Sequence, residues 1–436
     1  MIIELVLKNW LSFRDETVFS MVTQGEKRFL KRVPQIRSKP VLNINPVAVL
    51  YGGNASGKSN LLSFFGFLKT LVLNPIHEVG KAFPLRQYVL SKADVMIPTV
   101  VDFTFLTTDD HIFTLHLALA KDKVLEESLS VEEASDMRIL YERKENIVSI
   151  MDDGLKNDEK AVAFKEIVRQ NQLYLAIAGQ EVALLNSARG WFSRQLKLID
   201  TDAVLAKGGH CYVEEVKREK IANLLEKLDT GIGELKLSEA NEANLPLEIV
   251  EEIQNDLMTN AASVIVIRGR NIRFYATQQN GMMVLQKLVP CHRREDGVKQ
   301  PFELGMEAQG TVRLLDILPA FLELEDPSVR PVYIIDELDR SWHYMLSKKL
   351  LGIYLRGCTK DSRSQLLFST HDLMLMDQSL FRRSEMFLTE RSQEGVSSVF
   401  SLNMPGLRYD KDIRKMYLQG ALGGIPCLRH YGALND

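Results

Sequence analysis

Residues 52–59 read Gly52-Gly53-Asn54-Ala55-Ser56-Gly57-Lys58-Ser59 and match the pattern G-x-x-x-x-G-K-[S/T] at every fixed position. The apolar run Val47 to Tyr51 precedes this stretch, and a helical pattern follows it from about Ser59 until Pro75. A strand, a glycine-rich loop and a helix in this order form a phosphate-binding loop, because backbone N–H groups surround an anion at the positive end of the helix. The stretch therefore predicts an α/β fold that binds ATP.

Each part of this loop has an expected role. The Lys58 ammonium reaches the β- and γ-phosphates, and the Ser59 hydroxyl is a ligand of Mg²⁺. The glycines let the backbone curl closely around the phosphates. The residues that we expect to bind the nucleotide in this segment are Gly52, Gly53, Asn54, Ala55, Ser56, Gly57, Lys58, Ser59 and Asn60.

A pair of carboxylates follows a second apolar run, Val332-Tyr333-Ile334-Ile335-Asp336-Glu337. Because side chains alternate along a strand, Asp336 and Glu337 leave its end in different directions and can do different work. We expect Asp336 to complete the Mg²⁺ site and Glu337 to polarise the water that attacks the γ-phosphate. The predicted reaction is hydrolysis of ATP to ADP and phosphate.

The composition is that of a globular protein without an overall positive field. The chain has 436 residues, 45% of them hydrophobic and 25% charged, and a net charge of -3. Such a charge does not steer a protein onto nucleic acid or an anionic membrane. A local exception is loop 27–39, which is suited to a nucleic-acid backbone, to an acidic partner or to solvent, and which carries the cations Lys27, Arg28, Lys31, Arg32, Arg37 and Lys39.

The cysteines and the apolar runs bear on location. Cys211, Cys291, Cys358 and Cys427 lie far apart without a C-x-x-C pair, which is typical of reduced cytosolic thiols. The first residues lack a basic region and a cleavage site, and no apolar run reaches the roughly 18 residues that span a bilayer. We therefore expect a cytoplasmic protein with no membrane contact and no structural metal.

Periodicity along the chain predicts three parts. Residues 1–150 form a first ATPase lobe with the phosphate-binding loop and an antiparallel sheet. Residues 151–284 return to the 3.6-residue period and predict a mainly helical insert. Residues 285–436 form a second lobe in which strands and helices alternate around Asp336. The long heptad arms of SMC proteins are absent, because the insert lacks a sustained heptad pattern.

In this order, the motifs resemble those of the ABC/SMC-like ATPases of bacterial anti-phage and abortive-infection systems, the group that contains RloA, the AbiL ATPase, PtuA, AriA and the ATPase half of OLD nucleases. The matching segments are Lys8 to Phe13, Tyr51 to Asn60, Asp336 to His343, Ser369-Thr370-His371 and Gly420 to Leu428. The resemblance implies an ABC-type P-loop head of the SMC or RecF kind, split by the insert. Two such heads would close as a homodimer around two ATP molecules, each with Mg²⁺.

The same resemblance assigns further residues. It implies that Asp339 belongs to the D-loop at the dimer interface and that His371 contacts the γ-phosphate. It also implies that Glu307 to Thr311 is the signature segment, whose Gly310 contacts the nucleotide on the other subunit. This family usually has Glu-Ser-x-Gly-Thr, and Ala308 replaces the serine here, so one charge-assisted hydrogen bond of about 1.5 to 3 kcal/mol is missing.

The glutamine that ABC proteins use as a lever is not evident. Gln87, in Phe83-Pro84-Leu85-Arg86-Gln87, is either this residue or an ordinary surface glutamine.

Three functions from different classes stay open. The first, which the motifs and the near-neutral charge favour, is the ATPase of a defence system that holds or activates a separately encoded toxin or nuclease, often of the Toprim type in related loci. The second is a DNA-repair ATPase of the RecF or SMC type, which loop 27–39 would serve. The third is a transporter ATPase, which Glu-Ala-Gln-Gly-Thr at residues 307–311 disfavours.

Overall fold

The computed structural model describes residues 1–23, 25–36, 38, 40–78, 80–91, 97–133, 136–199, 204–260, 262–269, 272–404 and 411–424. The polypeptide divides into two units, of which the first comprises Met1–Leu198, Leu324–Asp339 and Ser347–Asp436, and the second Ile199–Glu323 and Arg340–Leu346. The first unit thus combines both ends of the chain. Its boundaries differ from the expected 1–150, 151–284 and 285–436, because residues 151–198 pack within the first unit and 285–323 within the second.

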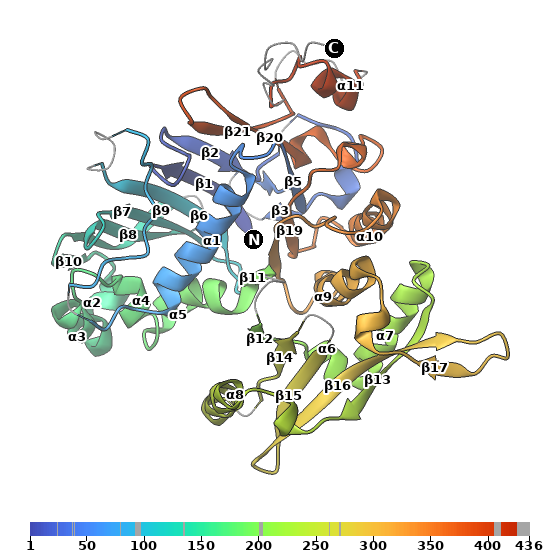
Figure 1. Ribbon diagram of the computed structural model, residues 1–436. Coiled ribbons are helices and arrows are strands. Elements are labelled where there is room, and N and C mark those ends of the chain that lie inside the picture. The colour runs from blue at the N-terminus through green and yellow to red at the C-terminus, as the bar shows by residue number, and fades with distance from the viewer. Residues whose placement is uncertain are drawn as a thin grey trace, which may run out of the picture. The chain divides into compact units, whose positions relative to one another are not determined.

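An antiparallel sheet of seven strands forms one layer of the first unit (Figure 1). Its order is β10-β9-β8-β7-β6-β1-β2. The strands are β1 (Ile2–Lys8), β2 (Thr17–Ser20), β6 (Thr99–Leu106), β7 (Ile112–Leu119), β8 (Val124–Glu133), β9 (Asp136–Lys144) and β10 (Ile147–Ile150). In β6, Val101, Phe103 and Phe105 face the core on alternate positions. The antiparallel sheet predicted for the first lobe is therefore confirmed.

A second sheet of the same unit carries the predicted motifs. Its order is β11-β18-β19-β5-β20-β21. The strands are β5 (Val47–Tyr51), β11 (Leu196–Ile199), β18 (Val332–Ile335), β19 (Gln365–Ser369), β20 (Met386–Arg391) and β21 (Ser397–Ser401). Neighbours from β18 to β20 are parallel, and β21 is antiparallel to β20. Every residue of β5, β18 and β19 is buried, as the uninterrupted apolar runs of these strands require.

Helix α1 (Lys58–Leu73) joins the two sheets into one core. The ring centroids of Phe65 and Phe103 of β6 are 6.0 Å apart, and those of Phe64 and Trp10 are 5.3 Å apart. Buried side chains of β5 and β19 belong to the same hydrophobic cluster. The aromatic residues after the phosphate-binding loop are therefore core residues, as their helical spacing predicted.

Short helices lie beside the end of the first sheet that the edge strand β10 occupies (Figure 1). They are α2 (Asp153–Lys156), α3 (Glu159–Ile167), α4 (Tyr174–Ala178), α5 (Ala183–Gly190) and η3 (Trp191–Gln195), of which α2 and α3 contact β10. Glu127 of β8 is fully buried and accepts hydrogen bonds from the backbone N–H groups of Tyr174 (2.8 Å) and Leu175 (2.9 Å) and from the Tyr141 hydroxyl (2.8 Å). This carboxylate satisfies the first N–H groups of α4, which would otherwise be buried without a partner.

The second unit is more mixed than the mainly helical insert that we expected. Its sheet has the order β12-β14-β15-β16-β13, with β17 added to β16. The strands are β12 (Leu205–Lys207), β13 (Ile232–Glu239), β14 (Ile265–Arg268), β15 (Arg273–Gln279), β16 (Met282–Arg293) and β17 (Lys299–Pro301), and the helices are α6 (His210–Val213), α7 (Glu215–Lys227), α8 (Leu247–Thr259) and α9 (Gln309–Leu324). Asp316 of α9 pairs with Arg268 and Arg273 at 3.2 and 2.9 Å. Strand β13 was not predicted, because one glycine and three charged residues interrupt its apolar pattern.

The Glu127 network makes a prediction about stability. Glu127→Ala leaves two buried N–H groups and a hydroxyl without their acceptor, and removes the carboxylate that lies 3.6 Å from the Arg143 guanidinium. We expect the free energy of unfolding to fall by about 3 kcal/mol or more. Urea denaturation followed by tryptophan fluorescence measures the loss. Glu126→Ala is the matched control, since its side chain is 56% exposed, and an equal effect of both substitutions would contradict the network.

Candidate functional site

Three parallel strands of the second sheet end at one edge, and each is followed by a predicted motif. Leu50 of β5 is in register with Ser369 of β19, and Phe368 is in register with Ile335 of β18. The phosphate-binding loop, the Ser369-Thr370-His371 segment and the Asp336-Glu337 pair therefore leave the sheet side by side. Ligands of open α/β sheets bind at the carboxyl ends of the strands, so this edge is the candidate site.

The phosphate-binding loop has a backbone shape that its glycines make possible. Gly52 and Gly57 have φ of 146° and 116°, and Ala55 has φ of 60°. A Cβ atom at Gly52 would lie 2.4 Å from the carbonyl oxygen of Thr389, and one at Gly57 would lie 2.7 Å from Oγ of Ser397. Strands β20 and β21 thus pack directly against the loop, and only glycine fits at these two positions.

Thr389 of β20 also bonds to the loop through its side chain. Its hydroxyl donates to the carbonyl oxygen of Tyr51 (3.1 Å) and lies 2.6 Å from the Ser56 hydroxyl. The Ser56 side chain is therefore buried and faces the protein, whereas Asn54, Ala55 and Ser59 are exposed. Sequence reasoning missed Thr389, because no local signal relates it to a loop more than three hundred residues earlier.

The Lys58 ammonium folds back onto the loop. It donates to the carbonyl oxygens of Gly52 (2.8 Å) and Gly53 (3.1 Å). Burial lowers the pKa of Lys58, and the negative charges of Asp336, Glu337 and Asp339 oppose that shift. Both acceptors are neutral, and a charged phosphate oxygen is a stronger partner for an ammonium than a carbonyl group.

Asn60 connects the loop with the N-terminal motif. Its side-chain amide donates to the Ser12 hydroxyl (2.7 Å), and its backbone carbonyl oxygen accepts from the Trp10 indole N–H (2.8 Å). The backbone N–H of Ser397 donates to the carbonyl oxygen of Ser12 (2.7 Å). Residues 8–13 therefore hold the start of α1 against β21.

Every residue of the Ser369-Thr370-His371 segment contacts at least one of the three acids that follow β18, Asp336, Glu337 and Asp339. The Ser369 hydroxyl donates to Oδ1 of Asp336 and accepts from the Glu337 backbone N–H (2.8 Å). The Thr370 hydroxyl donates to Oδ2 of Asp339 (2.9 Å). Nε2 of His371 lies 3.5 Å from Oε1 of Glu337.

The three acids have different surroundings. Burial raises the pKa of Asp339, whereas the Glu337 side chain is 41% exposed and the His371 side chain 45% exposed. Glu337 has a φ of 49°, a left-handed conformation that is uncommon outside glycine and concentrates at functional sites. The turn at Glu337 thus directs the two neighbouring carboxylates differently, with Asp336 toward β19 and Glu337 toward solvent.

The signature segment lies in the second unit. Gly310 is packed so closely that a Cβ atom would lie 2.4 Å from the carbonyl oxygen of Ser341, which is a local reason for glycine there. Glu307 contacts Nε2 of His292 at 2.6 Å, and Ala308 is exposed just before α9. Contact of Gly310 with a nucleotide on another copy stays a prediction.

Two weaker assignments also have an outcome. The Gln87 side chain donates to the carbonyl oxygen of Ile97 (2.8 Å), and its role as a lever stays a prediction. The end of the tail motif, from Ile425 onward, lies outside the described residues, as do Arg37 and Lys39 of the basic loop.

The residues at this edge fit Mg²⁺ with a nucleotide. Mg²⁺ takes one or two protein ligands together with phosphate oxygens and water, and Asp336 with the exposed Ser59 hydroxyl is such a set. In the part of the chain that the structure describes, no group of three or more His, Cys, Asp or Glu residues is arranged to hold a metal by itself. The described residues also contain no helix that is long and apolar enough to cross a membrane.

The parallel strand order, the loop and the carboxylate pair together define a P-loop ATPase of the α/β class, and an ABC-type head stays a prediction. A family model described as "AAA domain, putative AbiEii toxin, Type IV TA system" matches residues 47–377. This match covers more than half of the chain, and the chain belongs to that family. The expected ATPase class is confirmed, and membership of the RloA or AbiL group stays a prediction.

Two solved structures to which the chain is similar are heads of SMC proteins. The chain is similar to the SMC head domain from Thermotoga maritima, with 11% identity, 92% of this chain and 99% of that chain covered, and a TM-score of 0.37. It is also similar to an SMC head bound to the C-winged helix domain of ScpA, with 12% identity, 92% and 97% coverage and a TM-score of 0.40. No curated protein matches the chain.

Lys58 provides the first test of the site. Lys58→Ala removes the cation of the loop, and we expect it to abolish ATP binding because no other group of the loop neutralises the β- and γ-phosphates. Isothermal titration calorimetry with ATP and Mg²⁺ measures the affinity. Lys81→Ala removes the same charge from an exposed ion pair with Glu78 and serves as the control. Unchanged affinity in Lys58→Ala would refute the assignment.

Proposed function

We propose that this protein hydrolyses ATP with Mg²⁺ between two copies of itself, and that the cycle holds or activates a partner toxin or nuclease in bacterial anti-phage defence. One observation carries the hydrolytic part: the phosphate-binding loop, the Asp336-Glu337 pair and His371 leave one sheet edge together.

In the proposed mechanism, the loop N–H groups and Lys58 bind the phosphates, and Ser59 and Asp336 hold Mg²⁺. The bound metal neutralises charge that develops on the phosphates. Glu337 accepts a proton from the attacking water and orients it. His371, 3.5 Å from Glu337, would donate to the γ-phosphate, while Ser369 holds Asp336 through its hydroxyl.

The exposure of the site supports closure by a second copy. Glu337, His371 and Ser59 are all exposed or half-exposed, whereas efficient phosphoryl transfer uses a site from which bulk water is excluded. The signature residue Ala308 is exposed on the same chain. In a symmetric pair, residues 307–311 of each copy would cover the ATP site of the other copy. Such a pair would bury both the ATP site and the signature segment.

The chain connections offer a route from ATP to a change of shape. The polypeptide passes from the first unit to the second immediately after Asp339, three residues beyond Asp336. Asp339 accepts a hydrogen bond from Thr370, the residue that follows β19. Movement of residues 336–339 on hydrolysis would therefore reach the point after Asp339 where the chain enters the second unit. We propose that the second unit changes its position with the nucleotide state.

The family description names a toxin and a Type IV toxin–antitoxin system, which supports a role beside a separately encoded toxin or nuclease, of the Toprim type by resemblance, in the cytoplasm. The alternative is a RecF- or SMC-like DNA-repair ATPase. Copurification with the neighbouring gene product, with and without ATP, separates the two. ATP-dependent capture of a nuclease or toxin supports defence, and nucleotide-dependent DNA binding without such a partner contradicts it.

Glu337→Gln separates binding from hydrolysis. The amide keeps the shape of the side chain but cannot accept a proton, so ATP should bind normally while hydrolysis slows by about tenfold or more. Calorimetry and a single-turnover assay measure the two steps. Glu390→Gln, which makes the same change at a carboxylate of strand β20, is the control. If Glu337→Gln hydrolyses ATP at the unmodified rate, another group activates the water.

Ala308→Ser tests the signature. The serine restores one hydrogen bond toward the γ-phosphate on the other copy, and we expect turnover to rise by about tenfold if that bond contributes near 1.4 kcal/mol in the transition state. The gain must depend on two copies. When Ala308→Ser subunits are mixed with Lys58→Ala subunits, the turnover should rise only in pairs whose serine faces an ATP-loaded neighbour. An equal gain in a strictly monomeric preparation would show that residues 307–311 do not act across an interface.

A further inference from the structure

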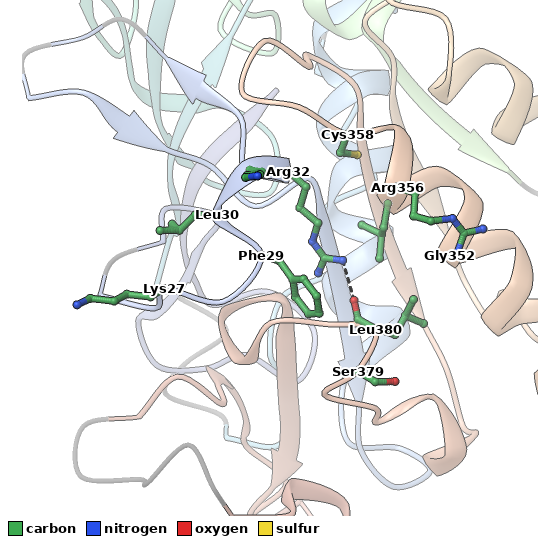
Figure 2. Close-up of a pocket in the computed structure, with 11 residues that line it drawn as sticks. Lys27, Phe29, Leu30, Arg32, Gly352, Arg356, Cys358, Ser379 and Leu380 are labelled. Atoms are coloured by element: carbon green, nitrogen blue, oxygen red, sulfur yellow. Dashed lines mark hydrogen bonds between the residues drawn. The ribbon is translucent and has the colours of Figure 1, made fainter.

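A pocket of about 730 Å³ lies in the first unit, apart from the ATP site residues (Figure 2). One wall is residues 27–32, which include the short helix η1 (Leu30–Arg32), and the other is α10 (Tyr344–Gly357) with Ser379 and Leu380. Its volume is within the range of ligand pockets, about 300 to 1,000 Å³. Nothing in the proposed hydrolysis uses it.

The pocket has an apolar interior. Phe29, Leu30, Leu355 and Leu380 contribute large side chains, and Phe29 and Leu30 are 38% and 52% exposed. Burial raises the pKa of the Cys358 thiol to about 12, so this residue is a neutral part of the lining. Exposed apolar side chains that gather around a hollow are typical of a surface that binds a partner.

The rim has one sign of charge. Among the described residues that line the pocket, every charged one is a cation: Lys27, Lys31, Arg32 and Arg356. The whole chain has a net charge of -3, so this rim stands out against the average surface. An occupant with acidic groups around an apolar centre complements both the rim and the interior.

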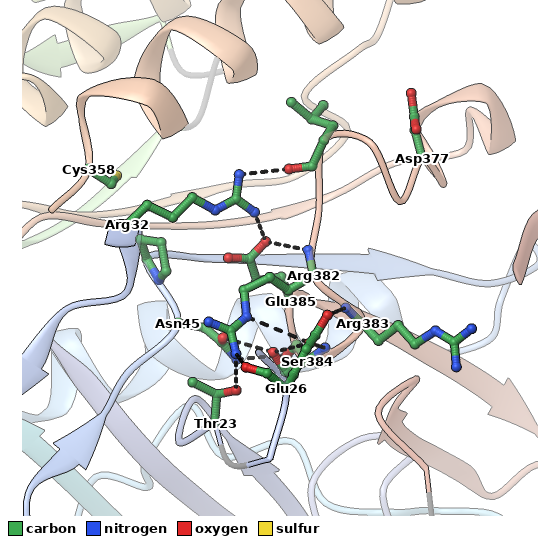
Figure 3. A network of polar contacts seen from close by, with 12 residues as sticks. Thr23, Glu26, Arg32, Asn45, Cys358, Asp377, Arg382, Arg383, Ser384 and Glu385 are labelled. Atoms are coloured by element: carbon green, nitrogen blue, oxygen red, sulfur yellow. Dashed lines mark hydrogen bonds and ion pairs between the residues drawn. The ribbon is translucent and has the colours of Figure 1, made fainter. Parts of the chain in front are cut away.

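A buried ionic network fixes the wall in place (Figure 3). At one end of the wall, Glu26 accepts from the backbone N–H groups of Arg383 and Ser384, both at 3.2 Å. At the other end, Arg32 donates to Glu385 (2.5 Å) and to the carbonyl oxygen of Leu380 (2.8 Å). Both ends of residues 26–32 are therefore anchored to the turn η7 (Arg383–Glu385), and the rim is preorganised, which lowers the entropic cost of binding.

The same network argues against nucleic acid as the occupant. Arg32 is engaged with Glu385, and its side chain is only 12% exposed. The guanidinium carbons of Arg28 and Arg32 lie over the Phe29 ring, 5.3 and 4.5 Å from its centroid. A nucleic-acid backbone needs a row of available cations, whereas here the cations surround an aromatic side chain and an apolar hollow.

We propose that this pocket binds an acidic segment of a partner protein, inserting one large apolar side chain between Phe29 and Leu380 while its carboxylates pair with Lys27 and Lys31. This is peptide recognition by an apolar anchor with a charged surround. The proposal goes beyond the proposed ATPase function, since it does not depend on hydrolysis.

The test uses a fluorescent short peptide with a central tryptophan flanked on both sides by glutamates, and measures its anisotropy without nucleotide. We expect saturable binding to the full chain below about 1 mM. The same peptide with alanine in place of tryptophan should bind at least about tenfold more weakly. No binding below that concentration, or equal binding of both peptides, would overturn the proposal.

Two variants locate the binding. Gly352→Leu fills the pocket and keeps every cation: a Cβ there meets only the flexible end of Arg356 (3.1 Å) and Leu380 (3.9 Å), and leucine is the better helix former. Lys27→Glu with Lys31→Glu reverses the rim at exposed positions. Each should weaken binding by about tenfold or more, while Lys121→Glu with Lys144→Glu, the same charge change at exposed positions elsewhere, should not.

The remaining outcomes identify a different occupant and contradict the proposal. Binding of a single-stranded oligonucleotide that Lys27→Glu with Lys31→Glu abolishes and Gly352→Leu leaves intact would show that these cations form a nucleic-acid surface. Self-association of the unmodified chain that Gly352→Leu abolishes would show that a second copy fills the pocket. Circular dichroism and retained ATP affinity confirm that each variant is folded. Because the peptide assay contains no nucleotide, its result is independent of whether Glu337 drives hydrolysis.

Discussion

The close contact between the phosphate-binding loop and strand β20 is the constraint on which the site depends. Gly52 has no room for a Cβ atom because the carbonyl oxygen of Thr389 would lie 2.4 Å away. The Thr389 hydroxyl then reaches Ser56 and Tyr51, so the loop is held by backbone shape and by side-chain bonds together. A loop shaped in advance presents its N–H groups to a phosphate without first having to order them.

Strand β20 is itself positioned by the ionic network that precedes it. Glu385, the residue before β20, is fully buried, and burial raises its pKa to about 7 in spite of Arg32 and Arg382. Its carboxylate accepts from Arg32 and from the Arg382 backbone N–H. Buried charges persist only when they are paired and hydrogen-bonded. The network therefore specifies where β20 begins, and through β20 it supports the phosphate-binding loop.

The local motifs could be predicted from sequence, and their long-range supports could not. Residues 47–59 and 332–337 can be recognised in the sequence, because the strand, the turn and the functional side chains are contiguous there. Thr389 and the strand around it show no such signal. Glu127 was not predicted either: it shares its face of β8 with the buried Leu129 and Val131, but its partners on α4 depend on the tertiary fold. For β13, charged residues concealed the strand period.

The pocket and the ATP site share segments of chain, which constrains how a partner could respond to ATP. Helix α10 begins shortly after Asp339, and Ser379 and Leu380 follow His371 within ten residues. Two walls of the pocket thus continue from segments that bear catalytic side chains. Coupling between sites is reciprocal and cannot exceed the difference in a ligand's affinity for the two states. A partner that binds equally well with and without nucleotide would be held by this pocket but not controlled through it. Control requires that hydrolysis move α10 relative to residues 27–32, because that separation determines whether an apolar side chain fits.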